Sequence, residues 1–176
     1  GSDVRRLSNG NVLLVSSNWT NTGIDGDGSD AGAVTWISGS TGLLAPMANS
    51  AAFDGIANAV GALNSLVGHA PGALVGSGGI IDDFGSVIVK SPSASGSTQT
   101  GTWSGAVTWM SASTGLLSNM TSGIDFAGIG GRLSSANSLL DVGTPTDTRT
   151  GFGSRLFLNT AWNGGRGSLT WMGSNG

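Results

Sequence analysis

The pentapeptide Gly-Ala-Val-Thr-Trp occurs at Gly32–Trp36 and again, unchanged, at Gly105–Trp109. A looser copy, Gly-Ser-Leu-Thr-Trp, occupies Gly167–Trp171. With an offset of 73 residues and no gaps, residues 31–68 align with residues 104–141, and 18 of the 38 aligned positions are identical. Similarity of this length at a fixed period indicates one supersecondary unit copied along the chain, in which each unit buries its apolar face against its neighbours.

A second repeated segment precedes each pentapeptide. Asn9–Ser17 corresponds to Phe84–Pro92 with an offset of 75 residues, and Phe152–Thr160 is the third version. The third copy lacks the Asn-Ser-Leu segment that closes the first two. We therefore predict two full units and one partial unit, at residues 1–73, 74–148 and 149–176.

Composition favours strands and excludes several classes of function. Glycine supplies 32 of the 176 residues, charged residues only 10%, and Cys, Tyr and Glu are absent. Abundant Gly, Ser, Thr, Asn and Val suit strands and tight turns better than helices. A net charge of −3 with scattered Lys and Arg argues against nucleic-acid binding. No apolar run is long enough to insert in a membrane, and disulfides are excluded.

The repeated segments predict short strands joined by glycine-rich turns. Asn9-Gly10 between apolar runs is a hairpin signal, because both residues tolerate positive φ. The apolar run in Val12–Ser16 predicts a strand buried on both faces. The other strands are expected in the following segments: Asp3–Leu7, Ala31–Ile37, Asn64–Gly68, Gly79–Ile81, Val87–Ser91, Gly105–Met110 and Ser138–Val142.

Turns and loops separate these strands. Turns are expected at Ser38–Gly42 and Asp82–Gly85, and a polar loop at Ser93–Thr102, with Pro92 ending the strand before it. Phe53–Leu63 has apolar residues at helical spacing, but the aligned segment of the second unit contains two adjacent glycines, so we favour an extended or irregular segment. The predicted fold is all-β, built of repeated antiparallel four-stranded meanders like the blades of a β-propeller; a β-solenoid is the alternative.

The second unit resembles the FG-GAP repeat of integrin-type β-propellers. The resemblance rests on Phe84-Gly85-Ser86 leading into Val-Ile-Val, on Ser91-Pro92, and on the Gly-Ala-Val that follows a polar loop. The order of these segments also resembles repeats of large secreted bacterial surface proteins of the haemagglutinin or adhesin kind. The resemblance implies a bacterial extracellular or cell-surface location and a structural or adhesive role.

Two and a half blades cannot close a propeller, which needs about four or more. The chain is therefore expected to be a piece of a longer array, or to associate with other copies of itself through an exposed sheet edge. We expect a non-catalytic structural or adhesive module that acts by self-association. The alternative is a carbohydrate-binding, lectin-like module.

Asp25, Asp27 and Asp30 form the one local cluster of carboxylates. Aspartates alternating with glycine place hard oxygen ligands around a tight loop, as Ca²⁺ requires. The corresponding loop of the second unit, at 97–101, contains no acidic residue. The cluster is either a calcium site or a solvated acidic turn.

Tryptophan is the other candidate binding residue. Trp19, Trp103 and Trp162 lie outside the pentapeptides and are the candidates for stacking on sugar rings. Tryptophan at a fixed position of every unit, as at Trp36 and Trp109, favours packing between units, because the indole buries a large apolar area.

The sequence shows no set of catalytic residues. The chain has one histidine, His69, and neither Cys nor Glu, so a transition-metal site and a histidine-based triad both lack their components. Asp82 and Asp83 are adjacent, and adjacent residues of an extended chain point in opposite directions, so we expect turn residues there. The prediction is that the protein is not an enzyme.

Overall fold

The structure is a computed structural model. It describes residues 3–22, 28–42, 44, 60, 65–68, 70–83, 85–98, 101–117, 131–132, 138–140, 146–150, 154–159 and 168–172. Within these residues the chain forms strands and no helix, and so contains no helix that could cross a membrane. The strands are β1 (Asp3–Arg6), β2 (Val12–Ser16), β3 (Ala33–Ile37), β4 (Ser65–Val67), β5 (Ile80–Asp83), β6 (Ser86–Thr98), β7 (Gly101–Ser111), β8 (Gly131–Arg132), β9 (Ser138–Leu140), β10 (Thr146–Thr150), β11 (Ser154–Asn159) and β12 (Ser168–Met172).

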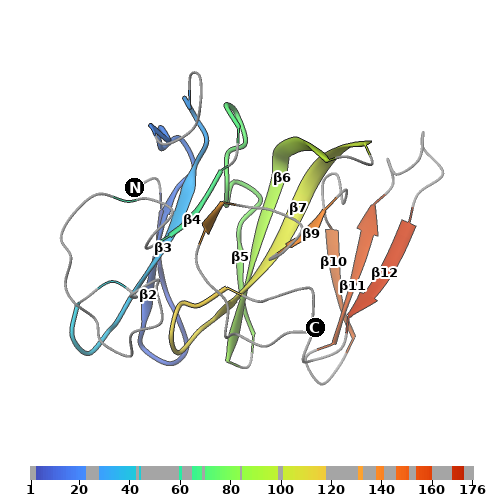
Figure 1. Cartoon of the computed structure of the whole chain (residues 1–176). Helices are drawn as coiled ribbons and strands as arrows, with labels where there is room; N and C mark the ends of the chain where they lie inside the picture. The colour runs from blue at the N-terminus through green and yellow to red at the C-terminus, as the bar shows by residue number, and fades with distance from the viewer. Residues whose placement is uncertain are drawn as a thin grey trace.

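These strands form three sheets that lie next to one another (Figure 1). The first sheet has the order β1-β2-β3-β4-β8, the second β5-β6-β7-β9 and the third β10-β11-β12. Neighbouring strands pair antiparallel, except that β8 pairs parallel with β4. The prediction of an all-β chain with antiparallel sheets is confirmed, and the pairing differs from the parallel coils of a β-solenoid.

The three sheets share one cross-strand register, as copies of one unit should. In the first sheet Leu13 is paired with Trp36. The equivalent residues Ile88 and Trp109 are paired in the second sheet, and Leu156 and Trp171 are paired in the third. The sequence repeat is therefore a repeat of backbone pairing, with the pentapeptide always on the strand that follows the apolar run.

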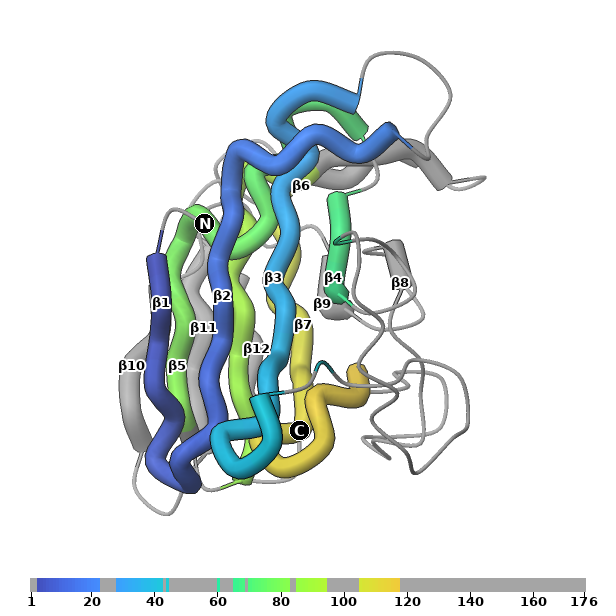
Figure 2. The backbone as a smooth tube through the Cα atoms, turned by 90° about the vertical axis from the view of Figure 1, so that its left-hand side faces the viewer, coloured from blue at the N-terminus to red at the C-terminus, as the bar shows by residue number. Residues whose placement is uncertain are grey.

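The first two sheets stack face to face. Figure 2 shows β1, β2 and β3 in front of β5, β6 and β7, strand over strand. Leu13 and Val15 of β2 are buried together with Val87 and Val89 of β6 in one apolar cluster. Because side chains alternate along a strand, the intervening residues lie on the opposite faces of these sheets.

The hairpin of β6 and β7 is longer than predicted. The prediction that Pro92 ends the strand and that a loop follows to Thr102 is wrong, since pairing resumes after an irregularity between Ser91 and Ser95. Proline lacks an N–H donor and is accommodated at bulges and where a neighbouring strand is absent. Pro92 lies inside that irregularity and beyond the residues of β6 that pair with β5.

Two other local predictions are corrected. Asp82 and Asp83 belong to strand β5, where they pair with Val87 and Ser86, and are not turn residues. Burial alternates along Val12–Ser16, so this strand is not buried on both faces. The segment Phe53–Leu63 lies outside the described residues apart from Val60.

Candidate functional site

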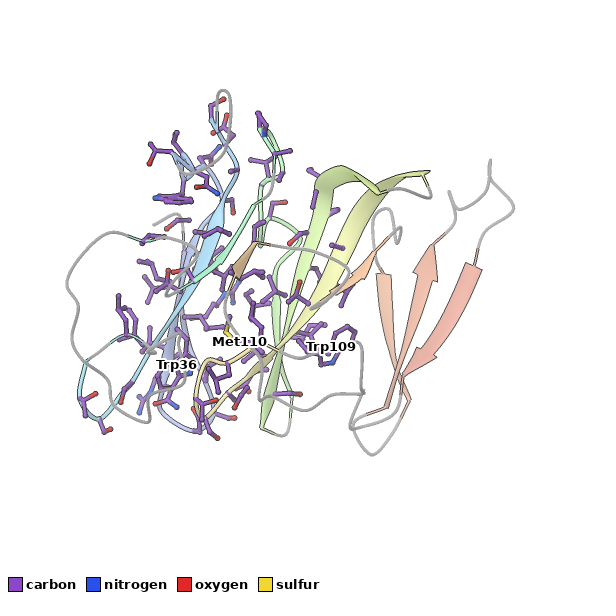
Figure 3. All side chains as sticks on the ribbon, viewed as in Figure 1. Trp36, Trp109 and Met110 are labelled. Atoms are coloured by element: carbon purple, nitrogen blue, oxygen red, sulfur yellow. The ribbon has the colours of Figure 1, made fainter. Side chains whose placement is uncertain are left out.

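The contact between repeat units whose side chains the structure describes is the interface of the first and second sheets. Side chains of both sheets form one buried cluster there, with Ile80 packed against it. The cluster comprises Leu7, Leu13, Val15, Val34, Trp36, Leu66, Ala73, Val75, Val87, Val89, Ala94, Ala106, Met110, Ala112 and Leu117. Figure 3 shows Met110 on the side of β7 facing the first sheet and Trp109 on the side facing the third sheet.

Trp36 is the largest side chain of this interface and is held by the turn that follows β7. Its indole Nε1 donates a hydrogen bond of 2.9 Å to the carbonyl oxygen of Ala112. A Cβ added at Gly115 would lie 2.7 Å from Cβ and Cγ of Trp36, so only glycine leaves room for the indole. The turn Ser111–Gly115 therefore recognises tryptophan by shape and by one polar contact.

The same carbonyl oxygen of Ala112 accepts two further hydrogen bonds from the first unit. Asn9 Nδ2 donates at 2.8 Å and Asn11 Nδ2 at 2.9 Å. Asn11 also accepts a hydrogen bond from the backbone N–H of Gly39 through its Oδ1 atom, at 2.9 Å. The two asparagines thus fasten the Leu7–Asn11 turn of the first unit to the turn that holds Trp36.

The first unit contains the same turn at Ser38–Gly42. In each turn the glycine N–H donates to the serine carbonyl, at 2.8 Å for Gly42 and 2.9 Å for Gly115. The backbone φ is 72° at both glycines, in the left-handed region that favours glycine. The two surroundings differ, because no atom of the described residues lies within 4 Å of the position that a Cβ would take at Gly42.

The sequence pattern did not predict this site. Ser-Thr-Gly-Leu-Leu occurs at both turns and pointed to a repeated turn, but not to a binding surface for tryptophan. Asn9 and Asn11 carry no such signal, because the aligned residues of the second unit are Phe84 and Ser86.

The candidate calcium residues are only partly described. Asp25 and Asp27 lie outside the described residues. Asp30 is exposed, has a φ of 53° and accepts a hydrogen bond of 2.9 Å from Asn18 Nδ2 through its Oδ1 atom. No group of three or more His, Asp or Glu residues within the described part of the chain is arranged to hold a metal ion.

The tryptophans divide into packed and candidate binding residues. Trp36 and Trp109 are 2% and 4% exposed, which confirms the prediction that they pack in the core. Trp19 is half-buried. Trp103 lies on β7, where only its backbone is described, and Trp162 lies outside the described residues, as does His69.

Asp82 links the first two units through a hydrogen bond. Its Oδ2 atom accepts a hydrogen bond from the backbone N–H of Ser8, which ties β5 to the Leu7–Asn11 turn. Its Oδ1 atom is buried and has no hydrogen-bond partner among the described residues. Asp83, the next residue of β5, pairs with Ser86.

Comparison with known proteins gives one match. Residues 6–77 are similar to a family described as a repeat of unknown function (DUF5650), and this match overlaps most of the predicted first unit. No curated protein and no solved structure matches the chain.

Proposed function

We propose that this chain is a non-catalytic structural or adhesive repeat module that acts by self-association. One observation carries the proposal: the residues copied between units include those that make the contact between units. Trp36 and the turn that holds it recur as Trp109 and the Ser38–Gly42 turn. In a repeat protein, stability is built from such interfaces between neighbours, so each unit carries both sides of a contact.

The three adjacent sheets support a blade-like arrangement of the propeller kind as the form of this module. The first sheet contains β1 to β4 in the order of a meander with β8 added beside β4, the second sheet has the order β5-β6-β7-β9, and the two sheets stack through one apolar core. The proposed location is the bacterial cell surface or extracellular space. This part of the proposal rests on the resemblance to secreted adhesin-like repeats and on the cysteine-free composition.

The test is the assembly state of the purified chain. Sedimentation velocity over a concentration series, with electron microscopy of the same samples, should show rings or filaments. Parallel samples with Ca²⁺ and with a chelator show whether the Asp25–Asp30 loop takes part. A chain that stays monomeric at every concentration, with or without Ca²⁺, would rule out self-association.

A carbohydrate-binding role is the second candidate, and the partial exposure of Trp19 favours it. An indole with one accessible side can stack on a sugar ring while its other side stays packed. A glycan array probed with the wild-type chain and with Trp19→Ala tests this role. A ligand whose signal is lost in Trp19→Ala would support it, and an array without any binder would remove it.

A further inference from the structure

The outer face of the first sheet is the repeat equivalent of a surface that is buried in the second sheet. This outer face consists of Val4, Val12, Leu14, Ile37 and Leu44. Its counterparts by sequence alignment and strand pairing are, in the same order, Ile80, Val87, Val89, Met110 and Leu117. In the second sheet these residues form the layer that packs against the first sheet.

Exposure separates the two copies of this surface. Val87, Val89, Met110 and Leu117 are at most 1% exposed. On the outer face the corresponding four residues are half-buried, and Val4 is 65% exposed. The outer face therefore presents apolar side chains to solvent at the positions where the second unit receives a neighbouring sheet.

The turn that receives tryptophan in the second unit is also present beside the outer face. Gly42 matches Gly115 in φ and in hydrogen bonding, and Gly39 provides the backbone carbonyl at the position of Ala112. The Gly42 turn belongs to the same strand connection as Ile37 and Leu44, which form an isolated bridge just as Met110 and Leu117 do. The outer face thus has the same backbone features as the surface that receives a tryptophan-bearing sheet in the second unit.

The chain itself carries a sheet with the matching residues. The register of the third sheet pairs Trp171 with Leu156 and Leu169 with Leu158. In the first sheet the equivalent pairs are Trp36 with Leu13 and Val34 with Val15, and these four residues pack on the second sheet. The register position of Trp171 thus belongs to the face of the unit that docks on the next unit.

We propose that the outer face of the first sheet binds the Trp171-bearing face of the third sheet of a second copy of this chain. The inference rests on the proposed self-association and specifies its surfaces. The contact continues the stacking that joins the first and second sheets within one chain. Because the two surfaces differ, the interface is heterologous, and repeated contacts produce rings or filaments with two distinct ends.

The experiment uses the full chain with one substitution on either side of the contact. Leu14→Glu places a carboxylate on the outer face, and Ser93→Glu adds the same charge at an exposed position of the second unit, outside both proposed surfaces, as the matched control. We expect Leu14→Glu to raise the apparent dissociation constant of assembly about tenfold or more, since a charge would be buried without a partner. Ser93→Glu should assemble like the wild type, and circular dichroism checks the fold of each variant.

A mixing experiment tests the direction of the contact. Trp171→Ala removes the docking residue from the other side, so it should also block assembly when alone. An equimolar mixture of Leu14→Glu and Trp171→Ala retains one intact pair of surfaces and should give a 1:1 heterodimer in sedimentation equilibrium. A heterodimer forms only if both variants are folded, so a loss of stability in either variant cannot produce this result.

Several results would overturn the inference. Assembly of the wild type that Leu14→Glu leaves unchanged would show that copies associate elsewhere, with the proposed function intact. Assembly blocked by Leu14→Glu but unaffected by Trp171→Ala would assign the outer face to pairing of two first sheets. A wild-type chain that never associates would reject the proposed function and the inference together.

Discussion

The turns Ser38–Gly42 and Ser111–Gly115 have the same backbone and different surroundings. Their glycines have the same φ, and their serine carbonyls accept the same hydrogen bond. Gly115 is covered by the indole of Trp36, whereas no atom of the described residues lies within 4 Å of the position that a Cβ would take at Gly42. The local sequence therefore determines the conformation of the turn. The neighbouring unit determines which side chain packs against the turn.

The largest loss of stability is expected when Trp36 is removed from the Ser111–Gly115 turn. Trp36→Ala should lower the free energy of unfolding by roughly 3–5 kcal/mol, because it empties a buried site and removes a donor from the Ala112 carbonyl. Urea denaturation followed by circular dichroism measures the change. Trp19→Ala, at a half-buried tryptophan, is the control and should cost less. Equal losses in the two variants would contradict the assignment of Trp36 as the principal contact.

A matched pair of glycine substitutions measures the difference between the turns directly. Gly42→Ala should cost about 1–2 kcal/mol, since an L-residue is held at positive φ. Gly115→Ala carries the same backbone cost and adds about 1–3 kcal/mol, because its methyl group would overlap Trp36. Thermal and urea unfolding of both variants give the two values. If the values are equal, the packing of Trp36 on Gly115 contributes nothing to stability.

A smaller loss of stability is expected when the hydrogen bonds of Asn11 that link the two turns are removed. Asn11→Ala should lower the free energy of unfolding by about 1–2 kcal/mol, because it removes one donor to Ala112 and the acceptor for the N–H of Gly39. Asn18→Ala, which removes an exposed hydrogen bond to Asp30, is the control and should change stability less. A loss at Asn18 as large as that at Asn11 would show that the link between the turns adds no more stability than an ordinary exposed hydrogen bond.

Much of the backbone was predictable from the sequence, because the repeat aligns strands with strands. The bounds of Val12–Ser16 were predicted as observed, and Ala31–Ile37 contains the observed β3. Both predictions rest on apolar runs bounded by glycine and asparagine turns, which are local signals. Short connections account for the antiparallel pairing of β1 with β2, of β5 with β6, of β6 with β7 and of β10 with β11, whereas the other paired strands are joined by longer segments.

The failures come from interactions that local sequence does not encode. The run Val12–Ser16 has the composition of a doubly buried strand, but its outer face has no described sheet against it, so burial alternates. Pro92 signals the end of a strand, but the chain crosses it at an irregularity where β5 has already ended. Proline and apolar composition limit the possible structures, and neighbouring strands select among them.

In the candidate site, too, some contacts could be predicted from the sequence and others could not. The position of Trp36 in the core followed from its recurrence in each unit, because residues at equivalent positions meet equivalent neighbours. The hydrogen bonds that Asn9 and Asn11 donate could not be predicted from the repeat. Both residues differ between units, and both bond to a turn about 100 residues away in sequence. A single side chain with a distant backbone partner leaves no periodic signal.

The match between the Ser38–Gly42 and Ser111–Gly115 turns has a consequence for how such a gene can lengthen. Each of the two full units contains a pentapeptide tryptophan and a glycine turn of the kind that receives one. An in-frame duplication of one unit therefore introduces both halves of the new contact at once, and no compensating substitution is needed elsewhere. Alleles that differ in the number of units are accordingly compatible with the same fold.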